Sequence, residues 1–121
     1  MKNIFLIFTI FFLLCTNSFA RSERSYQKEW CPILNGKIEV VMPDRTRCDC
    51  LTEDYAIEFD FGKKWYEAIG QSLHYAVLTG KKPGIALIVE KEKDLKRWES
   101  LKRVIEYFKL DIKTWKIEPN K

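Results

Sequence analysis

Two acidic residues, Glu58 and Asp60, alternate with apolar residues in segment 55–61. If this segment is a strand, its apolar side chains occupy one face and the two carboxylates share the other. Carboxylates in such a setting are costly unless they are solvated, paired or bound to a cation. The segment therefore predicts a site at which acidic side chains come together.

A third carboxylate, Asp49, belongs to the preceding segment 46–52, which also has the composition of a strand. If the two strands pair, Asp49 comes alongside Glu58 and Asp60. Three carboxylates suit Mg²⁺ or Mn²⁺, because hard cations take oxygen ligands and retain waters. We therefore expect Asp49, Glu58 and Asp60 to be metal ligands, with Glu39 as a weaker, outer carboxylate.

The next segment, 63–79, has helical spacing. Its apolar stripe is predicted to consist of Trp65, Ala68, Ile69, Leu73, Ala76 and Val77. Beside that stripe, Lys64, Glu67, Gln71 and Tyr75 lie within about 60° of a common line at roughly 100° per residue. A polar row at the margin of the buried face can point toward a site on the sheet. Ordinary exposure to solvent is the alternative for these residues.

The elements that would position these residues form a mixed α/β pattern. In chain order they are a loose lead over 21–30 into a short helix ending near Cys31, strands at 37–42, 46–52 and 55–61, a helix at 63–79, a strand at 85–89, a helix capped by Asp94 and a strand at 112–117. Tight turns between the first three strands indicate an antiparallel meander. The crossover helix should be right-handed, so the fourth strand is expected to run parallel to a strand of the meander.

Cysteines point to an oxidising compartment. Cys48 and Cys50 are two residues apart, and a direct bond between them would be strained. Cys31 is therefore expected to pair with Cys50 or Cys48, which would tie the N-terminal helix to the sheet. A zinc site would need a fourth ligand, and His74, which has no evident partner acid in the sequence, is the only histidine.

The first 20 residues have the pattern of a secretory signal peptide. Lys2 precedes an apolar run over 4–14, and Ser18-Phe19-Ala20 has the small-x-small form of a cleavage site. The run is shorter than the roughly 20 residues of a membrane span, so no stable span is expected after cleavage. We predict a signal peptide at 1–20 and one domain at 21–121, exported to the bacterial periplasm or outside the cell; an uncleaved anchor is the alternative.

The charge of the chain is compatible with a nucleic-acid partner without requiring one. The formal net charge is +4 over 121 residues. The pairs Lys63-Lys64 and Lys81-Lys82 would form a phosphate-facing patch if the two ends of the predicted helix came together, and solvated helix ends are the alternative. A monomer and a homodimer are both compatible with the sequence.

A resemblance to a known family links these residues. Asp49, then Glu58-Phe59-Asp60, then Gln71-Ser72-Leu73-His74-Tyr75 resembles the PD-(D/E)XK nuclease superfamily, the restriction-endonuclease-like fold. Its α-β-β-β-α-β core matches the predicted order over residues 26–89, and the segment 47–88 looks like small exported bacterial proteins with this core. The resemblance implies that Asp49 and Glu58 bind Mg²⁺ and that Gln71 and Tyr75 match a Q-x-x-x-Y pattern.

The chain departs from the family motif at one position. Residue 60 is Asp where the motif has a lysine, which gives a variant E-x-D motif. Lys64, one helical turn later, is expected to take over the lysine's role of stabilising developing negative charge. The implied activity is metal-dependent hydrolysis of phosphodiester bonds in DNA or RNA, with Asp49, Glu58, Lys64 and Gln71 as catalytic residues.

Two other functions are consistent with the same sequence. One is a binding module that kept the nuclease core and lost the chemistry, which the missing motif lysine favours. The other is a secreted interaction protein held together by a disulfide, which would bind no divalent metal. Metal binding separates these functions.

Overall fold

The computed structural model describes residues 20–119 of the chain. The predicted signal peptide, residues 1–20, lies outside the described residues apart from Ala20. The elements are α1 (Glu23–Ile33), β1 (Lys37–Val41), β2 (Arg47–Leu51), β3 (Tyr55–Phe61), the 3₁₀ helix η2 (Gly62–Lys64), α2 (Trp65–Thr79), β4 (Lys82–Ile88), α3 (Glu92–Tyr107) and β5 (Lys113–Ile117). None of the helices within residues 20–119 is both long enough and apolar enough to cross a membrane.

The five strands form one mixed sheet in the order β1-β2-β3-β4-β5. β1, β2 and β3 are antiparallel neighbours. β4 runs parallel to both β3 and β5. The predicted α/β class, the meander and the parallel fourth strand are confirmed.

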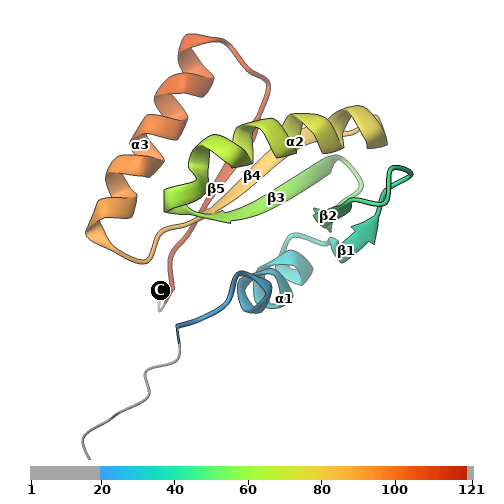
Figure 1. The fold of residues 1–121 in the computed structure, drawn as a ribbon, viewed down its shortest axis with the longest axis horizontal. Coiled ribbons are helices and arrows are strands. Elements are labelled where there is room, and N and C mark those ends of the chain that lie inside the picture. Colours follow the sequence, from blue (N-terminus) through green and yellow to red (C-terminus); the bar gives the residue numbers. More distant parts are fainter. Residues whose placement is uncertain (1–19, 120–121) are drawn as a thin grey trace, which may run out of the picture.

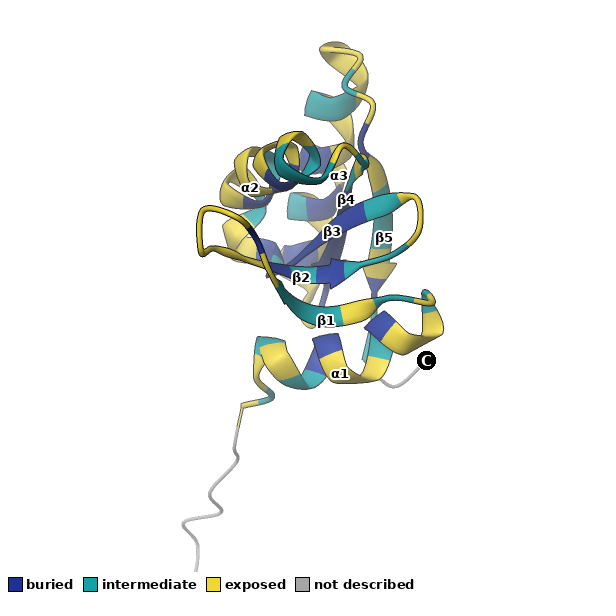
Figure 2. Cartoon of the chain, turned by 90° about the vertical axis from the view of Figure 1, so that its right-hand side faces the viewer, coloured by how far each residue is buried: buried dark blue, intermediate teal, exposed yellow. Residues whose placement is uncertain are grey.

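Helices cover both faces of the sheet, with α1 on one side and α2 and α3 on the other (Figure 1). The α1 side buries one apolar cluster, made of Tyr26, Cys31, Cys50, Ile57, Phe59, Ala86, Ile88 and Ile117. The opposite side buries a second cluster, made of Ala68, Ile85, Leu87, Val89, Trp98, Leu101 and Ile112. β3 and β4 lie between the helical layers on the two faces of the sheet, and they are the most buried strands (Figure 2).

The N-terminal helix is longer than predicted, and the loose lead over residues 21–30 is wrong. Ser22 is the N-cap, and its side chain accepts a hydrogen bond from the Ser25 N–H at 3.2 Å. Tyr26 and Cys31 are buried against the sheet. A cap and two buried anchors stabilise a helix whose sequence is otherwise polar.

Cys31 is bonded to Cys50, one of its two predicted partners, with a Cα–Cα distance of 5.7 Å. The bond ties α1 to β2, and a bridge of this span typically stabilises a small domain by about 2–4 kcal/mol. Gly36 lies against it, since a Cβ at this position would be 2.4 Å from the Cys50 sulfur. Cys48 is a buried free thiol. Its burial raises the pKa to about 11, which keeps the thiol protonated and unreactive.

The buried face of α2 differs from the predicted stripe. Leu73 is 38% exposed and Val77 is 81% exposed, whereas Ala68, Ser72 and Tyr75 are buried. The helix is thus rotated toward its polar row, which places Ala68, Ser72 and Tyr75 over the sheet. Ser72 tolerates burial because its hydroxyl donates to the Ile69 carbonyl at 2.9 Å.

The ends of the later elements agree with expectation only in part. Gly80 terminates α2 in the left-handed conformation at φ 69°, as a glycine after a helix predicts. β4 begins at Lys82 and includes Pro83, which was expected only to stop the helix. Asp94 does act as a cap, but from inside α3, since its carboxylate accepts from the N–H groups of Glu90 and Lys91 at 3.0 and 3.1 Å.

Candidate functional site

The carboxylates predicted from the sequence lie together on the α2 side of the sheet. Glu58 is 5% exposed and Asp60 is 4% exposed, while their neighbours Ile57 and Phe59 face α1. The carboxyl groups of Asp49 and Glu58 lie close enough for each to change the pKa of the other. We call Asp49, Glu58 and Asp60, with the residues described next, the acidic cluster.

An irregularity in β2 brings Asp49 into this cluster. Residues two apart in a regular strand share a face, yet Cys50 packs on the α1 side and Cys48 packs beside Tyr75 of α2. The strand therefore changes direction at Asp49. The Asp49 carboxylate accepts a hydrogen bond from the Phe59 N–H of β3 at 2.8 Å, in the way a backbone carbonyl does between paired strands.

Two further acids complete the cluster. Glu23, in the first turn of α1, lies close enough to Asp60 for its charge to raise the Asp60 pKa, and Glu39 of β1 interacts with both Glu23 and Asp49. Glu39 has φ 55°, a left-handed conformation that is unusual for a residue within a strand. Sequence reasoning rated Glu39 as an outer carboxylate and missed Glu23. The available signal was Ser22 directly before it, which marks a helix start.

The environment favours the protonated form of each buried acid. Burial is the largest cause and raises the pKa of Asp60 to about 8, with repulsion from Glu23 and Asp49 adding to it and Lys64 opposing it. Burial likewise raises the pKa values of Asp49 and Glu58. The charges of Asp49 and Asp60 add to the rise at Glu58, whereas the hydrogen bond from the Phe59 N–H opposes the rise at Asp49. Like charges held this close cannot all ionise without a counter-charge.

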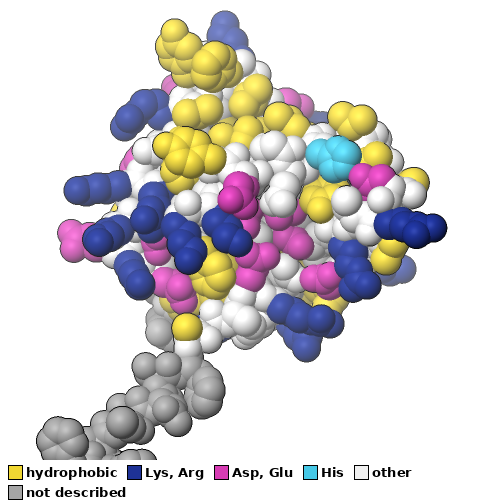
Figure 3. Space-filling view, viewed as in Figure 1, with side chains coloured by type: hydrophobic (Ala, Val, Ile, Leu, Met, Phe, Trp, Pro, Cys, Tyr) yellow, Lys and Arg dark blue, Asp and Glu magenta, His cyan; other side chains and the backbone are white. Residues whose placement is uncertain are grey.

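The polar row on α2 reaches the cluster in part. Lys64 and Glu67 interact with Asp60, and Tyr75 is buried near Asp49 and Glu58. Burial, followed by the nearby Glu58 and Asp49 charges, raises the pKa of Tyr75 to about 12. Gln71 is exposed one turn away from both Glu67 and Tyr75. On this face of the molecule, acidic side chains gather below α2, with basic side chains beside them (Figure 3).

His74 does not stand alone, contrary to the sequence-based expectation. Its Nε2 lies 2.8 Å from a carboxylate oxygen of Asp44, in the turn between β1 and β2. Asp44 is bound to Thr46 and His74, and these hydrogen bonds hold its pKa below the ordinary value. The contact joins the turn to α2. Because Cys31 and Cys50 form a disulfide, they are also unavailable as zinc ligands.

The two lysine pairs do not form a shared patch. Lys63 and Lys64 precede α2, whereas Lys81 and Lys82 follow it. The helix has 15 residues, so its ends are about 22 Å apart. Lys81 instead donates to the Glu53 carbonyl at 2.5 Å.

The donor set suits a hard divalent cation, although it is not a finished cage. Glu58 Oε2 and Asp60 Oδ2 are buried without a hydrogen-bond partner. The carboxylates of Asp49, Glu58 and Asp60 are oxygen donors, as Mg²⁺ and Mn²⁺ prefer. Among residues 20–119, however, no three His, Cys, Asp or Glu side chains are already arranged to hold a metal ion. Mg²⁺ commonly keeps its waters and binds through only one or two carboxylates, so unpartnered oxygens fit its requirements.

Comparisons with known proteins do not identify a function for this site, so its interpretation depends on the geometry described above. No family model, no curated protein and no solved structure matches the chain. The fold and the acidic cluster therefore define the class of protein as an α/β domain with an acidic site between its first two helices.

Proposed function

We propose that this protein is an exported, metal-dependent nuclease-like hydrolase of phosphodiester bonds with a restriction-endonuclease-like core. The observation that carries the proposal is the pair of unpartnered buried oxygens, Glu58 Oε2 and Asp60 Oδ2. Unsatisfied buried carboxylate oxygens destabilise a fold, so their presence calls for a ligand. A divalent cation satisfies them and neutralises the repulsion within the cluster.

The topology supports the same proposal. The chain has the α-β-β-β-α-β order, and its first four strands lie in sequence order in the sheet. Asp49 lies on the second strand and Glu58 on the third, which are the positions that the family resemblance assigns to metal ligands. The Cys31–Cys50 bond supports action outside the cytoplasm, because disulfides persist in oxidising compartments.

Each residue in the cluster has a proposed role. When bound, Mg²⁺ supplies Lewis-acid chemistry and lowers the pKa of a coordinated water. Asp49 and Glu58 would hold it, with Asp60 as a third ligand. Lys64 interacts with Asp60, which supports its taking the role of the absent motif lysine and stabilising negative charge on the phosphate. Gln71, exposed on α2, would orient the water or a phosphate oxygen.

A second function is favoured by two observations. Position 60 carries Asp in place of the motif lysine, and within residues 20–119 no three ligands are already arranged around one point. Both are expected of a binding module that kept the core and lost catalysis. This alternative predicts metal or ligand binding without turnover.

Thermal unfolding with and without Mg²⁺ or Mn²⁺ tests the metal site. Binding to the folded state raises the midpoint, and Glu58→Gln should abolish that rise because it removes a central ligand. Glu53→Gln is the matched control, since Glu53 is an exposed acid in the turn before β3. No rise for the native protein, or an equal rise in Glu58→Gln, would end the proposal.

Cleavage assays then separate an enzyme from a binding module. Plasmid DNA, single-stranded DNA and RNA are incubated with the protein in Mn²⁺ and, as a control, in EDTA. Lys64→Gln should lower the cleavage rate by about 100-fold while leaving the metal-induced shift in place, since Lys64 acts on the phosphate. A metal-induced shift without cleavage of any substrate would favour the non-catalytic module.

A further inference from the structure

A pocket with a basic lining lies where the end of β3 meets the segment after β4 and the start of α1. It has a volume of about 290 Å³ and is lined by Arg21, Lys63, Lys91, Arg97, Glu90 and Asp94. Phe61, at the end of β3, forms an apolar wall. Its positive side chains outnumber the negative ones by two, so an anion is the ligand that the pocket favours.

Both acids in the pocket are already engaged. Asp94 binds Arg97 at 2.8 Å in addition to its backbone donors, and Glu90 accepts a hydrogen bond from the Tyr26 hydroxyl at 2.8 Å. Within the described part of the chain, Lys63 and Lys91 have no ion-pair partner. Their ammonium groups are therefore available to an incoming anion.

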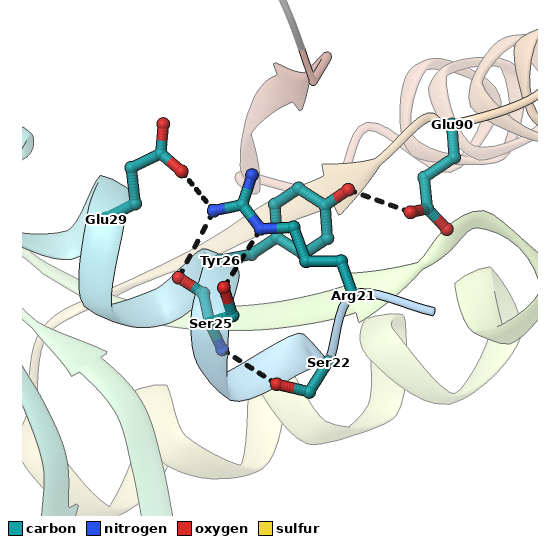
Figure 4. Close-up of polar contacts among 6 residues, drawn as sticks. All are labelled: Arg21, Ser22, Ser25, Tyr26, Glu29 and Glu90. Atoms are coloured by element: carbon teal, nitrogen blue, oxygen red, sulfur yellow. Dashed lines mark hydrogen bonds and ion pairs between the residues drawn. The ribbon is translucent and has the colours of Figure 1, made fainter. Parts of the chain in front are cut away.

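Arg21, which lines the pocket, is fixed in position. Its guanidinium lies 3.8 Å from the centre of the Tyr26 ring and donates to the Ser25 hydroxyl at 3.0 Å. Glu29 binds the outer edge of the same group (Figure 4). Tyr26 thus orients both Arg21 and Glu90, which leaves the pocket with a preorganised cation on one side.

The pocket and the acidic cluster share two short stretches of chain. Lys63 lines the pocket, whereas Lys64, the next residue, acts on Asp60. Arg21 lines the pocket, whereas Glu23 interacts with Asp60 from the same helix start. The same two stretches of chain therefore contribute residues to the pocket and to the candidate metal site.

A phosphate monoester matches this pocket better than a carboxylate does. It carries about −1.5 to −2 charge at pH 7 and three strong acceptor oxygens, which two free ammonium groups and two guanidinium groups can contact. A carboxylate carries a single charge and would leave one lysine unpaired. Cleavage after Ala20, which the leader predicts, would add the α-ammonium group of Arg21 to the same wall.

We propose that this pocket binds a phosphate monoester, the terminal phosphate of a nucleic-acid strand whose adjoining phosphodiester reaches the acidic cluster. This assignment rests on the proposed nuclease-like function and makes the activity specific for phosphorylated strand ends. Phe61 offers a face against which the terminal nucleotide can pack.

Inorganic phosphate is the first probe, titrated calorimetrically at low salt without divalent metal. The protein should bind it, and the double variant Lys63→Gln/Lys91→Gln should bind it at least about tenfold more weakly, because two charge-assisted contacts are lost. Lys93→Gln/Lys96→Gln is the matched control: it makes the same charge change on exposed residues of α3 and should bind normally. Equal binding by both variants, or no binding by the native protein, would contradict the proposal that this pocket binds phosphate.

Short DNA strands with and without a terminal phosphate are the second probe. The phosphorylated strand should bind at least about tenfold more tightly, and Lys63→Gln/Lys91→Gln should remove the difference. Equal affinity for both strands, with inorganic phosphate still bound, would overturn the assignment to a strand end. Glu58→Gln keeps the two proposals apart, since it should abolish the metal-induced shift and leave phosphate binding unchanged.

Discussion

β3 and β4 are adjacent strands in parallel register, yet they solve the same packing problem differently. Glu58 pairs with Ile85, and Asp60 pairs with Leu87. All four side chains are buried on the face that α2 and α3 cover. β4 fills its share of that layer with aliphatic groups, and β3 fills its share with carboxylates.

Stability alone would favour the solution of β4 in both strands. Buried aliphatic side chains contribute about 1.5–3 kcal/mol each, whereas a buried carboxylate without a full set of partners is destabilising. A sheet that tolerates acids beside such a core therefore has another use for them. The contrast between the two strands is the physical basis for placing the functional site on β3.

The largest effect should come from exchanging the roles of these two strands. Ile85→Ala should lower the free energy of unfolding by about 2–5 kcal/mol, because it opens a cavity in the α2 layer. Glu58→Met should instead raise it by about 1–3 kcal/mol in EDTA at pH 8, since it replaces an unpartnered carboxylate by an apolar chain of similar size. Urea unfolding measures both, and a loss of stability in Glu58→Met equal to that in Ile85→Ala would erase the contrast.

The other face of β3 depends on the disulfide that fixes α1. Cys31→Ala/Cys50→Ala should lower the free energy of unfolding by about 2–4 kcal/mol, mainly because the unfolded chain is no longer constrained. Cys48→Ala, which removes the buried free thiol, is the control and should have a smaller effect. Calorimetric unfolding under oxidising conditions compares them, and equal losses would show that the bond does not secure this layer.

Proton binding distinguishes the acid-bearing strand from its neighbour. The pKa of Asp60 in the folded protein, about 8, lies above its ordinary value of 3.8, so the folded state binds more protons than the unfolded state. The contribution of Asp60 to the free energy of unfolding is therefore fully present below about pH 4. It is lost as the pH rises toward 8, and without metal the loss is at least about 2 kcal/mol.

Unfolding followed from pH 5 to pH 9 in EDTA measures this loss. Asp60→Asn should flatten the profile, whereas Asp54→Asn, in an exposed turn, should not. A native protein that gains stability over this range would show that the carboxylates are solvated, contrary to their burial.

The smallest effect concerns the strand that carries Glu39. Its φ of 55° is strained for a side chain with a Cβ, so Glu39→Gly should raise stability by up to about 1 kcal/mol. The ion pair with Arg47 is lost, but at 3.9 Å and with Arg47 exposed it contributes little. Val40→Gly at an ordinary position of the same strand is the control and should be destabilising. A loss of stability in Glu39→Gly would show that interactions of the Glu39 side chain outweigh the strain of its backbone conformation.

Local sequence patterns predicted the sheet well because alternation is a short-range property. Glu58 and Asp60 could be assigned to one face of β3 from their spacing alone. The strain of a direct Cys48–Cys50 bond restricted Cys31 to two partners, Cys50 or Cys48, and only the structure identifies Cys50 as the partner.

The remaining features depend on contacts between distant segments. Glu23 joins the cluster because a buried Tyr26 anchors α1 on the sheet, and no pattern within residues 21–30 reveals that docking. The exposure of Leu73 and Val77 follows from the rotation of α2 over the acids of β3. A helical stripe identified by hydrophobicity alone places those residues inside.

The most direct test of the account is a Mn²⁺ titration followed by electron paramagnetic resonance at pH 8, which counts bound ions without requiring catalysis. The native protein should remove free Mn²⁺ from solution at one or two sites, and Glu58→Gln/Asp60→Asn should lose that binding while remaining folded. Binding that is unchanged in the double variant, or absent from the native protein, would contradict the claim that the carboxylates of β3 hold a divalent cation.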